Sequence, residues 1–345
     1  MSQLINALAA REPHGKLEPF SFDPGPLGPE QIEVEVEYCG ICHSDVSMTN
    51  NEWGFTQYPF VPGHEAVGRI VGVGSAVPGI ANQPGNPMGK RVGVGWFAGS
   101  CMGCSQCLSG NHNLCQTAEQ TIVGRHGAFA TRVRTNWGWA VPLPDGLDPV
   151  SAGPLFCGGI TVFNPLVEAG VKPTDRVGVI GIGGLGHMAL QFLRHWGCEV
   201  YAFSSNPAKS DEIRKFGAHH VVNSRDAADM AHLNGKLNFI LSTVAVDLDW
   251  NGYFSTLAPK GRFHFVGVIP NPVPVPVFPF ILGQKSVGAS PLGSPATLVT
   301  MLDFCVRHDI KPMVEVFKMS DANAAFEHLE SGKARYRVVL ENDLT

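Results

Sequence analysis

The alternation of apolar and polar positions divides the chain into two kinds of sequence. Residues 30–40 alternate polar and apolar side chains, which predicts a half-buried antiparallel strand. Short apolar segments follow at 69–74 and 91–95, and glycine and proline interrupt them. About the first 150 residues are therefore predicted to be strand-rich and irregular.

From about residue 153 the pattern changes to strands that alternate with helices. Short apolar strands are predicted at 176–180, 199–203, 237–241 and 262–267. Helices are predicted to begin near 188 and 210, between these strands. This alternation indicates an α/β fold with a doubly wound parallel sheet. The remaining elements are helices near 295–307 and 321–331 and a last strand at 336–341.

These patterns divide the 345 residues into two domains, a number that suits a chain of this length. We expect a first domain at 1–152, a parallel-sheet domain at 153–286, and a return to the first domain at 287–345. The segment Pro270–Pro279 alternates proline and valine. Because proline donates no hydrogen bond to a sheet, we expect an edge or a loop there, near a subunit contact.

Composition excludes several classes of protein. A net charge of -5 without a run of Lys or Arg argues against a nucleic-acid partner. No segment reaches about 18 uninterrupted apolar residues, so no membrane span is expected. The N-terminus lacks a basic region followed by an apolar stretch, so secretion is not expected. Nine cysteines, an odd number, favour thiolate ligands over disulfides. They are also consistent with a cytoplasmic location, where thiols stay reduced.

Four cysteines crowd into fifteen residues. They are Cys101, Cys104, Cys107 and Cys115. This spacing is typical of a structural zinc site, in which four thiolates fill a tetrahedral shell and exclude water. Gly103 is expected to let the loop fold back on itself. Four buried free thiols are the alternative, and their density within the loop argues against it.

A second metal site is indicated by residues that lie far apart in the sequence. Cys42 and Cys157 flank His64, which follows Gly63. Two thiolates and one imidazole leave a tetrahedral position open, as in catalytic zinc sites. The alternative makes His64 a core histidine and Cys157 a buried apolar residue. Cys39 competes with Cys42 as a ligand.

A glycine-rich turn stands between a predicted strand and a predicted helix. Its residues are Gly181, Gly183, Gly184, Leu185 and Gly186. The pattern is typical of dinucleotide binding, because glycines allow the backbone to approach a pyrophosphate at a helix N-terminus.

The end of the next strand indicates which dinucleotide binds. It lacks the acid that NAD-binding proteins place there and carries Ser204, Ser205 and Lys209, which can contact a phosphate. The sequence therefore predicts NADP(H). The alternative leaves Lys209 as a solvated charge at a helix start.

Together these residues resemble the zinc-dependent medium-chain alcohol dehydrogenases, and within them the cinnamyl alcohol dehydrogenase-like branch. The resemblance covers essentially the whole chain. It is most specific at residues 39–45, 63–68, 101–115, 155–161, 181–188 and 287–294. It implies a Rossmann domain joined to a β-rich GroES-like catalytic domain. It also implies two zinc ions per chain, Cys42 rather than Cys39 as a ligand, and a homodimer formed through edges of the nucleotide-binding sheet.

The resemblance also assigns roles around the catalytic zinc. Ser44 would hydrogen-bond the substrate oxygen. His43 would link that hydroxyl to solvent through the nicotinamide ribose, or it would be a surface histidine beside the cofactor phosphates. Asp45 would orient His64. Glu65 would approach the zinc during ligand exchange, or serve only in an ion pair. Further contacts implied for the cofactor fall to Thr161, Thr243, Gly267 and Ser290, and less specifically to Arg337 at the pyrophosphate.

The activity implied is NADP(H)-dependent interconversion of small-molecule aldehydes and primary alcohols. Zinc would polarise the carbonyl and the nicotinamide would supply hydride. Trp53, Phe55 and Trp96 are expected to form an apolar wall that suits aromatic aldehydes; the alternative is that they are core residues. The stretch from Cys115 to residue 130 is shorter than in the plant lignin enzymes, so a broad substrate range is expected.

Three other functions are weighed against this one. Reduction of a C=N bond in an iminium substrate needs no proton relay, and the presence of Ser44 and His43 argues against it. A non-catalytic binding protein on this scaffold would lose a zinc ligand, and none is lost. A zinc-free quinone reductase would lack the cysteine set altogether.

Overall fold

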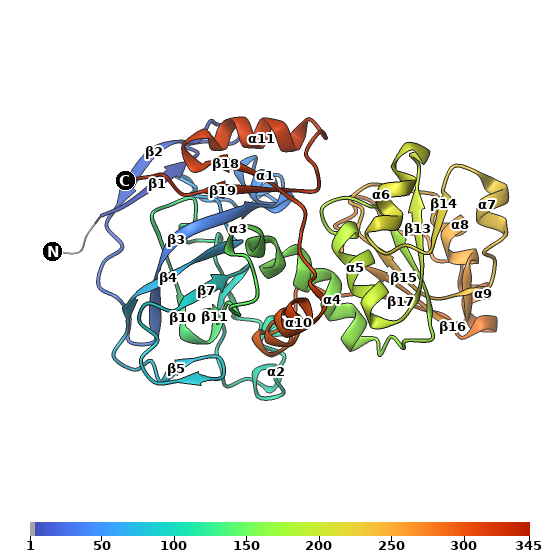
Figure 1. Cartoon of the computed structure of the whole chain (residues 1–345), viewed down its shortest axis with the longest axis horizontal. Coiled ribbons are helices and arrows are strands. Elements are labelled where there is room, and N and C mark those ends of the chain that lie inside the picture. Colours follow the sequence, from blue (N-terminus) through green and yellow to red (C-terminus); the bar gives the residue numbers. More distant parts are fainter. Residues whose placement is uncertain (1–3) are drawn as a thin grey trace. The chain divides into compact units, whose positions relative to one another are not determined.

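The computed structural model describes residues 4–345, which form two compact units (Figure 1). The first unit contains the residues up to 160 and residues 293–345, and the second contains residues 161–292. The chain therefore changes units somewhat later than the boundaries expected at 152/153 and 286/287. At the first boundary the reason is helix α4, Gly158–Glu168, which runs from one unit into the other.

The first unit is rich in short strands. Its strands are β1 (Ile5–Ala9), β2 (Glu18–Phe22), β3 (Gln31–Ile41), β4 (Ala66–Val73), β5 (Gly79–Ile80), β6 (Gln83–Pro84), β7 (Arg91–Val94), β8 (Phe97–Gly99), β9 (Glu119–Gln120), β10 (Arg132–Asn136), β11 (Val141–Pro142), β18 (Val314–Lys318) and β19 (Arg337–Glu341). Its helices are α1 (His43–Thr49), α2 (Ser105–Leu108), α3 (Pro149–Ala152), α10 (Pro295–His308) and α11 (Ala322–Glu330), with short 3-10 turns at His112–Leu114, Trp137–Trp139, Gly153–Phe156 and Met319–Asp321.

The main sheet of this unit has seven strands in the order β11-β7-β4-β3-β19-β18, and β10 also pairs with β3. The predicted alternation in β3 has a direct structural cause. Its apolar side chains at 32, 34 and 36 are buried in the core. On its other face, Glu33 pairs with arginines of β10, and Glu37 pairs with Arg69 of β4 and Arg91 of β7. Burial of one face and cross-strand charge pairing on the other together fix the register.

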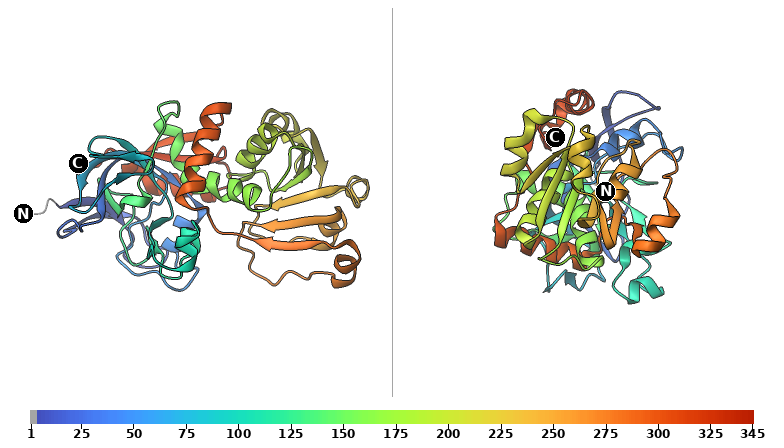
Figure 2. Two further views of the ribbon diagram at one scale, coloured as in Figure 1. Left: turned by 90° about the horizontal axis from the view of Figure 1, so that it is seen from below. Right: turned by 90° about the vertical axis from the view of Figure 1, so that its right-hand side faces the viewer.

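The second unit contains a six-stranded parallel sheet, which confirms the predicted doubly wound fold (Figure 2). The strand order is β14-β13-β12-β15-β16-β17. The strands are β12 (Arg176–Ile180), β13 (Glu199–Ser204), β14 (His220–Asn223), β15 (Leu237–Ser242), β16 (Leu257–Phe265) and β17 (Ser286–Ala289). The helices are α5 (Gly186–Trp196), α6 (Ser210–Lys215), α7 (Ala227–Ala231), α8 (Trp250–Ser255) and α9 (Val277–Gly283), and a 3-10 turn occupies Pro207–Lys209.

Helix α9 departs from the sequence-based expectation. The segment Pro270–Pro279 is a loop only as far as Pro276, which caps the helix that begins at Val277. Alternating prolines exclude a central strand, as expected, but proline is tolerated in the first turn of a helix. The prolines therefore could not exclude a helix there.

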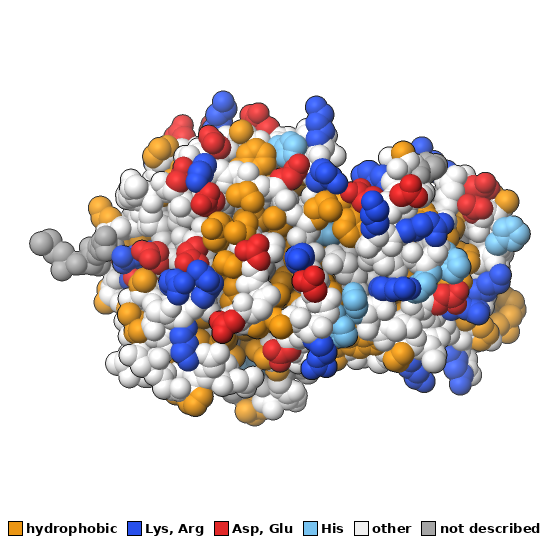
Figure 3. All heavy atoms as spheres, in the orientation of Figure 1, with side chains coloured by type: hydrophobic (Ala, Val, Ile, Leu, Met, Phe, Trp, Pro, Cys, Tyr) orange, Lys and Arg blue, Asp and Glu red, His pale blue; other side chains and the backbone are white. Residues whose placement is uncertain are grey.

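The surface is mixed in charge. On the face shown in Figure 3, basic and acidic side chains are interspersed over the described residues rather than gathered by sign. Within residues 4–345, no single helix is long and apolar enough to cross a membrane. One bent pair, Pro149–Phe156 with Gly158–Glu168, passes the same test of length and composition.

Candidate metal centres and cofactor site

The first candidate metal centre begins where β3 ends. The chain leaves the strand at Ile41, and Cys42 becomes the N-cap of α1. The carboxylate of Asp45, in the first turn of α1, accepts hydrogen bonds from the backbone N–H groups of Cys42 (2.9 Å) and Gly63 (2.8 Å). Gly63 has a φ of 104°, and a Cβ there would lie 2.6 Å from the ring of Phe129. Only glycine therefore fits the turn that leads to His64.

His64 is held in one orientation by the same carboxylate. Its Nδ1 lies 2.8 Å from Asp45 Oδ1, and both side chains are fully buried. Because the carboxylate accepts the Nδ1 proton, the Nε2 lone pair faces the opposite way. There Nε2 lies 3.3 Å from Cys157 Sγ, and Cys157 Sγ lies 3.9 Å from Cys42 Sγ.

These three atoms fit a zinc ion. Tetrahedral zinc with Zn–S bonds of about 2.3 Å holds two thiolates about 3.8 Å apart. The hydrogen bond with Cys157, opposed by burial, lowers the pKa of the Cys42 thiol well below its usual range, and the same contact raises the pKa of Cys157. A divalent cation would replace this shared proton, since metal ligation requires deprotonated thiols. Cys39 is buried beside the backbone of Gly40 and belongs to no metal-binding group among residues 4–345.

Glu65 lies within the same group of residues that could hold a metal ion. The donor atoms of Cys42, His64, Glu65 and Cys157 all lie within 4.8 Å of one another. Glu65 Oε1 accepts a short hydrogen bond from the buried guanidinium of Arg337, whereas Glu65 Oε2 is buried with no hydrogen-bond partner in the described chain. Burial raises the pKa of Glu65, although the charge of Arg337 opposes the shift. An unpartnered buried carboxylate oxygen beside a cationic site is suited to bind metal.

Ser44 and His43 lie at the start of α1. The Ser44 hydroxyl is 3.7 Å from Cys42 Sγ. The His43 side chain is exposed. The structure thus places the Ser44 hydroxyl beside the metal ligands. The imidazole of the preceding residue, His43, reaches solvent.

The three predicted pocket aromatics cluster beside the same centre. The ring of Trp96 meets the ring of His64 edge to face with centroids 5.0 Å apart. Trp53 packs against Trp96 at 6.0 Å and stacks on Phe55 at 5.9 Å. Trp53 and Trp96 pack against a small core of Met48, Phe60 and Ile122, while Phe55 is 50% exposed. An apolar aromatic surface therefore extends from the histidine ligand to solvent.

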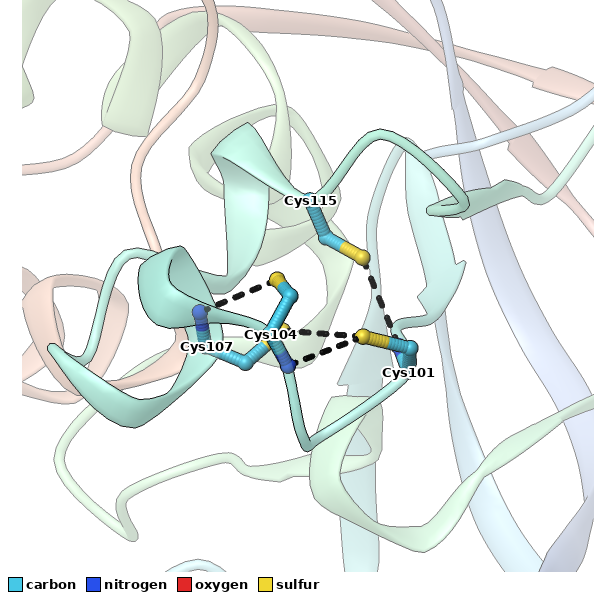
Figure 4. Close-up of side chains that lie close together, drawn as sticks. All are labelled: Cys101, Cys104, Cys107 and Cys115. Carbon is cyan, nitrogen blue, oxygen red and sulfur yellow. Dashed lines mark hydrogen bonds between the residues drawn. The ribbon is translucent and has the colours of Figure 1, made fainter.

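The second candidate metal centre is the four-cysteine loop (Figure 4). Its four sulfur atoms lie within 4.8 Å of one another. Backbone N–H groups of the loop donate to them, from Cys104 to Cys101 Sγ (3.3 Å), from Cys107 to Cys104 Sγ (3.5 Å) and from Cys101 to Cys115 Sγ (3.4 Å). The fold-back occurs at Met102, whose φ is 58°, and not at Gly103 as the sequence suggested.

Hydrogen bonds within this loop favour the thiolate form of two of its cysteines. The backbone N–H of Cys101 and the hydroxyl of Thr117 lower the pKa of Cys115 to about 6. Backbone N–H groups of Gly103 and Cys104 also lower the pKa of Cys101. Desolvation raises the pKa of Cys107 to about 11. Two of the four sulfurs are therefore biased towards the charged form that binds zinc.

The glycine turn of the second unit follows β12 and leads into α5. Gly181 has a φ of 85°, and a Cβ on Gly186 would lie 2.0 Å from the carbonyl oxygen of Gly181. Both positions therefore require glycine. A Cβ on Gly183 would meet nothing within 4 Å, so open space adjoins this part of the turn. Thr243, the residue that follows β15, holds the turn, because its hydroxyl donates to the carbonyl oxygens of Ile180 and Gly181.

A cavity of about 770 Å³ adjoins this turn. Gly181, Ser204, Ser205 and Lys209, all predicted cofactor residues, line it. The other predicted cofactor residues, Thr161, Gly183, Gly184, Leu185, Gly186, Thr243, Gly267 and Ser290, are not among the lining residues. The glycine cradle and the large cavity beside it fit a dinucleotide.

Sequence reasoning missed several residues of this cavity. Arg225 follows β14, Val244 and Val246 follow β15, and Tyr253 lies in α8. Ligands of doubly wound sheets bind at the carboxyl ends of the strands, so the residues that follow each strand were the available signal. Reasoning from the sequence used that signal only for β12 and β13.

Comparisons with known proteins show the family of the chain. Residues 28–145 match the alcohol dehydrogenase GroES-like domain, and residues 184–307 match the zinc-binding dehydrogenase family. The chain is 57% identical over 339 residues to aldehyde reductase AdhA of Synechocystis sp., covering 98% of this chain and 99% of that protein.

Two solved structures share the whole fold. Cinnamyl alcohol dehydrogenase SbCAD4 of Sorghum bicolor superposes with a TM-score of 0.91 at 34% identity, with 98% of each chain covered. A cinnamyl alcohol dehydrogenase of Helicobacter pylori complexed with NADP(H) gives 0.89 at 28% identity, with 99% of each chain covered. The first unit is accordingly a GroES-like domain and the second a Rossmann domain. The chain belongs to the zinc-dependent medium-chain alcohol dehydrogenases, in the cinnamyl alcohol dehydrogenase-like branch.

Proposed function

We propose that this protein is an NADP(H)-dependent aldehyde reductase of broad range that accepts aromatic aldehydes and holds two zinc ions. The observation that carries the proposal is the cluster of Cys42, His64 and Cys157, with the Trp96 ring 5.0 Å from the histidine ring. One site would offer a ligand position to a carbonyl oxygen and an apolar wall to the rest of an aromatic substrate.

The chain's own residues would prepare and complete the reaction. When bound, zinc supplies polarisation of a carbonyl and NADPH supplies hydride. Asp45 keeps the Nδ1 proton of His64 in place, so Nε2 stays available as a ligand. Ser44, beside Cys42, would donate its hydroxyl proton to the oxygen that gains charge. His43 would then return a proton to Ser44 from solvent.

The preference for NADP(H) rests on the end of β13. Ser204, Ser205 and Lys209 line the cavity, and no acid stands at that strand end to repel a phosphate. The relative from Helicobacter pylori was solved with NADP(H). A kcat/KM with NADH above that with NADPH would contradict this preference.

Reduction of an iminium substrate is the second candidate reaction. Hydride addition to a cation needs no proton, so Ser44 would be dispensable. Replacing Ser44 with Ala separates the two reactions, because aldehyde reduction should fall about 100-fold and imine reduction should not change.

The main proposal is tested by metal analysis and by NADPH oxidation with a panel of aliphatic and aromatic aldehydes. Two zinc ions per chain and aldehyde-dependent oxidation are expected. Fewer than two zinc ions, or no oxidation with any aldehyde, would contradict it. Cys42→Ser should abolish turnover and should leave the zinc ion of the four-cysteine loop bound. One zinc ion per chain in this variant, against two in the wild type, would count the sites.

A homodimer and a cytoplasmic location are further parts of the proposal. The parallel sheet ends on β17, and the segment that joins β16 to β17 exposes apolar side chains, at Val268, Val277, Phe278, Ile281 and Leu282. An exposed strand edge flanked by apolar side chains is suited to pair with a second copy of the chain. All nine cysteines are free thiols, which suits a reducing compartment.

A further inference from the structure

The cofactor cavity receives residues from two neighbouring strand ends. Strands β13 and β14 are parallel neighbours, with Ser204 opposite Asn223. The backbone N–H of Ser224 donates to the carbonyl oxygen of Ser204 at 3.2 Å, so the loops that follow the two strands also adjoin. Lys209 lines the cavity after the first loop, and Arg225 lines it from the second.

These two side chains are the cations of the cavity. Among its described lining residues, Lys209 and Arg225 are positive and Asp249 is the one acid. The structure gives neither cationic side chain an ion pair or hydrogen bond within residues 4–345. The acids next to Arg225 are engaged with backbone amides, because Asp226 accepts from the N–H of Ala228 and Asp229 from the N–H of Asn223.

One of the two hydroxyls at the end of β13 is already hydrogen-bonded, so a bound phosphate could accept from a further donor. Ser204 Oγ accepts from the N–H of Asn206 (3.2 Å) and also lies 3.3 Å from the carbonyl oxygen of that residue. This hydroxyl therefore already serves its own loop, which leaves Ser205 and Lys209 as donors on that side. A phosphate presents three strongly accepting oxygens, and the guanidinium fork of an arginine can bind two of them.

We propose that Arg225 acts with Lys209 to bind the 2′-phosphate that distinguishes NADP(H) from NAD(H). This inference rests on the proposed function and extends it, since it assigns the preference to two loops instead of one. Arg225 becomes a specificity-determining residue that sequence patterns at the end of β13 do not reveal.

The test measures binding to the zinc-loaded full-length enzyme by titration calorimetry, with 2′,5′-ADP and 5′-AMP as probes. Arg225→Gln should raise the Kd of 2′,5′-ADP roughly tenfold, as expected for the loss of one charge-assisted contact. The Kd of 5′-AMP should change by less than about twofold, because an exposed charge acts weakly on a ligand that it does not touch. Arg225→Lys should retain part of the affinity for 2′,5′-ADP.

Lys215→Gln is the matched control. Lys215 is an exposed cation at the end of α6, outside the cavity lining, so this variant should bind both probes as the wild type does. The KM values for NADPH and NADH, measured with the same aldehyde, give a second readout. In Arg225→Gln the KM for NADPH should rise and the KM for NADH should not change.

The outcomes separate this inference from the proposed function. If the wild type prefers 2′,5′-ADP and Arg225→Gln keeps that preference, the role of Arg225 is overturned and NADP(H) dependence stands. An equal loss for both probes also overturns it, because Arg225 would then contact the adenosine. If the wild type binds both probes equally, the NADP(H) assignment itself fails, and this inference fails with it.

Discussion

At the scale of single residues, Asp45 joins the start of α1 to the candidate catalytic zinc site. One of its oxygens accepts from Gly63 and His64, and the other accepts from Cys42. Asp45→Asn would place an NH₂ group where acceptors are needed, so zinc affinity or kcat/KM should fall about 10–100-fold. Zinc content and aldehyde reduction measure this effect, with Glu52→Gln in the following turn as control. Unchanged values in Asp45→Asn would contradict the orienting role.

His264 gives the second residue-scale prediction. It is buried in the Rossmann domain, and its Nε2 bonds Ser290 Oγ at 2.9 Å. Burial, together with the charge of Arg262, lowers its pKa from 6.5 to about 4. The unfolded chain therefore binds a proton between these values while the folded chain does not. The resulting stability is present above pH 6.5 and is lost as the pH falls towards 4.

Through His264, the free energy of unfolding should be about 2 kcal/mol lower at pH 5 than at pH 7. Urea unfolding of the wild type and of His264→Gln at both pH values measures this contribution. The variant should show a smaller decrease, because glutamine retains a hydrogen-bonding group but takes up no proton. An equal decrease in the two proteins would show that His264 does not carry the effect.

At the scale of elements, the loop 101–115 has little regular structure to stabilise it, because it contains only α2 and one 3-10 turn. Cys104→Ser should therefore cost folding stability more than chemistry, with a Tm lowered by about 5 °C or more. Thermal unfolding and kcat/KM below the transition measure both effects. Ser105→Ala changes an exposed neighbour that offers no metal ligand, so this variant should keep the wild-type Tm and kcat/KM. A variant of Cys104 with wild-type Tm would contradict a structural zinc.

The elements also show which patterns are informative without a structure. Residues 30–40 could be predicted as a strand because one of its faces is buried and its other face is charged. Helix α9 could not, because prolines that disfavour a strand are compatible with the first turn of a helix. Residue type was also a poor guide in the four-cysteine loop. The turn was expected at Gly103, whereas the left-handed conformation is taken by Met102.

At the scale of the whole molecule, the two metal centres differ in what the sequence can reveal. Cys101 to Cys115 form one local loop, so their spacing alone predicts a shared ion. Cys42, His64 and Cys157 lie far apart in the sequence, so their residue types alone left a core histidine and a buried cysteine as the alternative, and the resemblance was needed to choose Cys42 over Cys39. Arg337 lies 272 residues from Glu65 in the sequence, and nothing local indicates that they pair. The predicted contact of Arg337 with a pyrophosphate stays a prediction.

The proposed dimer is also a property of the whole molecule, because each main sheet has an edge strand that could accept a partner. One such edge is β18 in the GroES-like domain and another is β17 in the Rossmann domain. Helix α9, next along the chain to β17, exposes Phe278, Ile281 and Leu282 by 67–72%. Exposed apolar side chains of this size favour burial against a second copy at β17.

Phe278→Glu should therefore shift the protein to monomer in sedimentation experiments at micromolar concentration, because a charge would be buried at the contact. Val316→Glu changes a half-exposed apolar residue of β18 and serves as the matched control. A dimer that survives Phe278→Glu but dissociates in Val316→Glu would place the contact on the GroES-like domain. The parallel sheet would then end at a free edge, and the exposed face of α9 would need another partner.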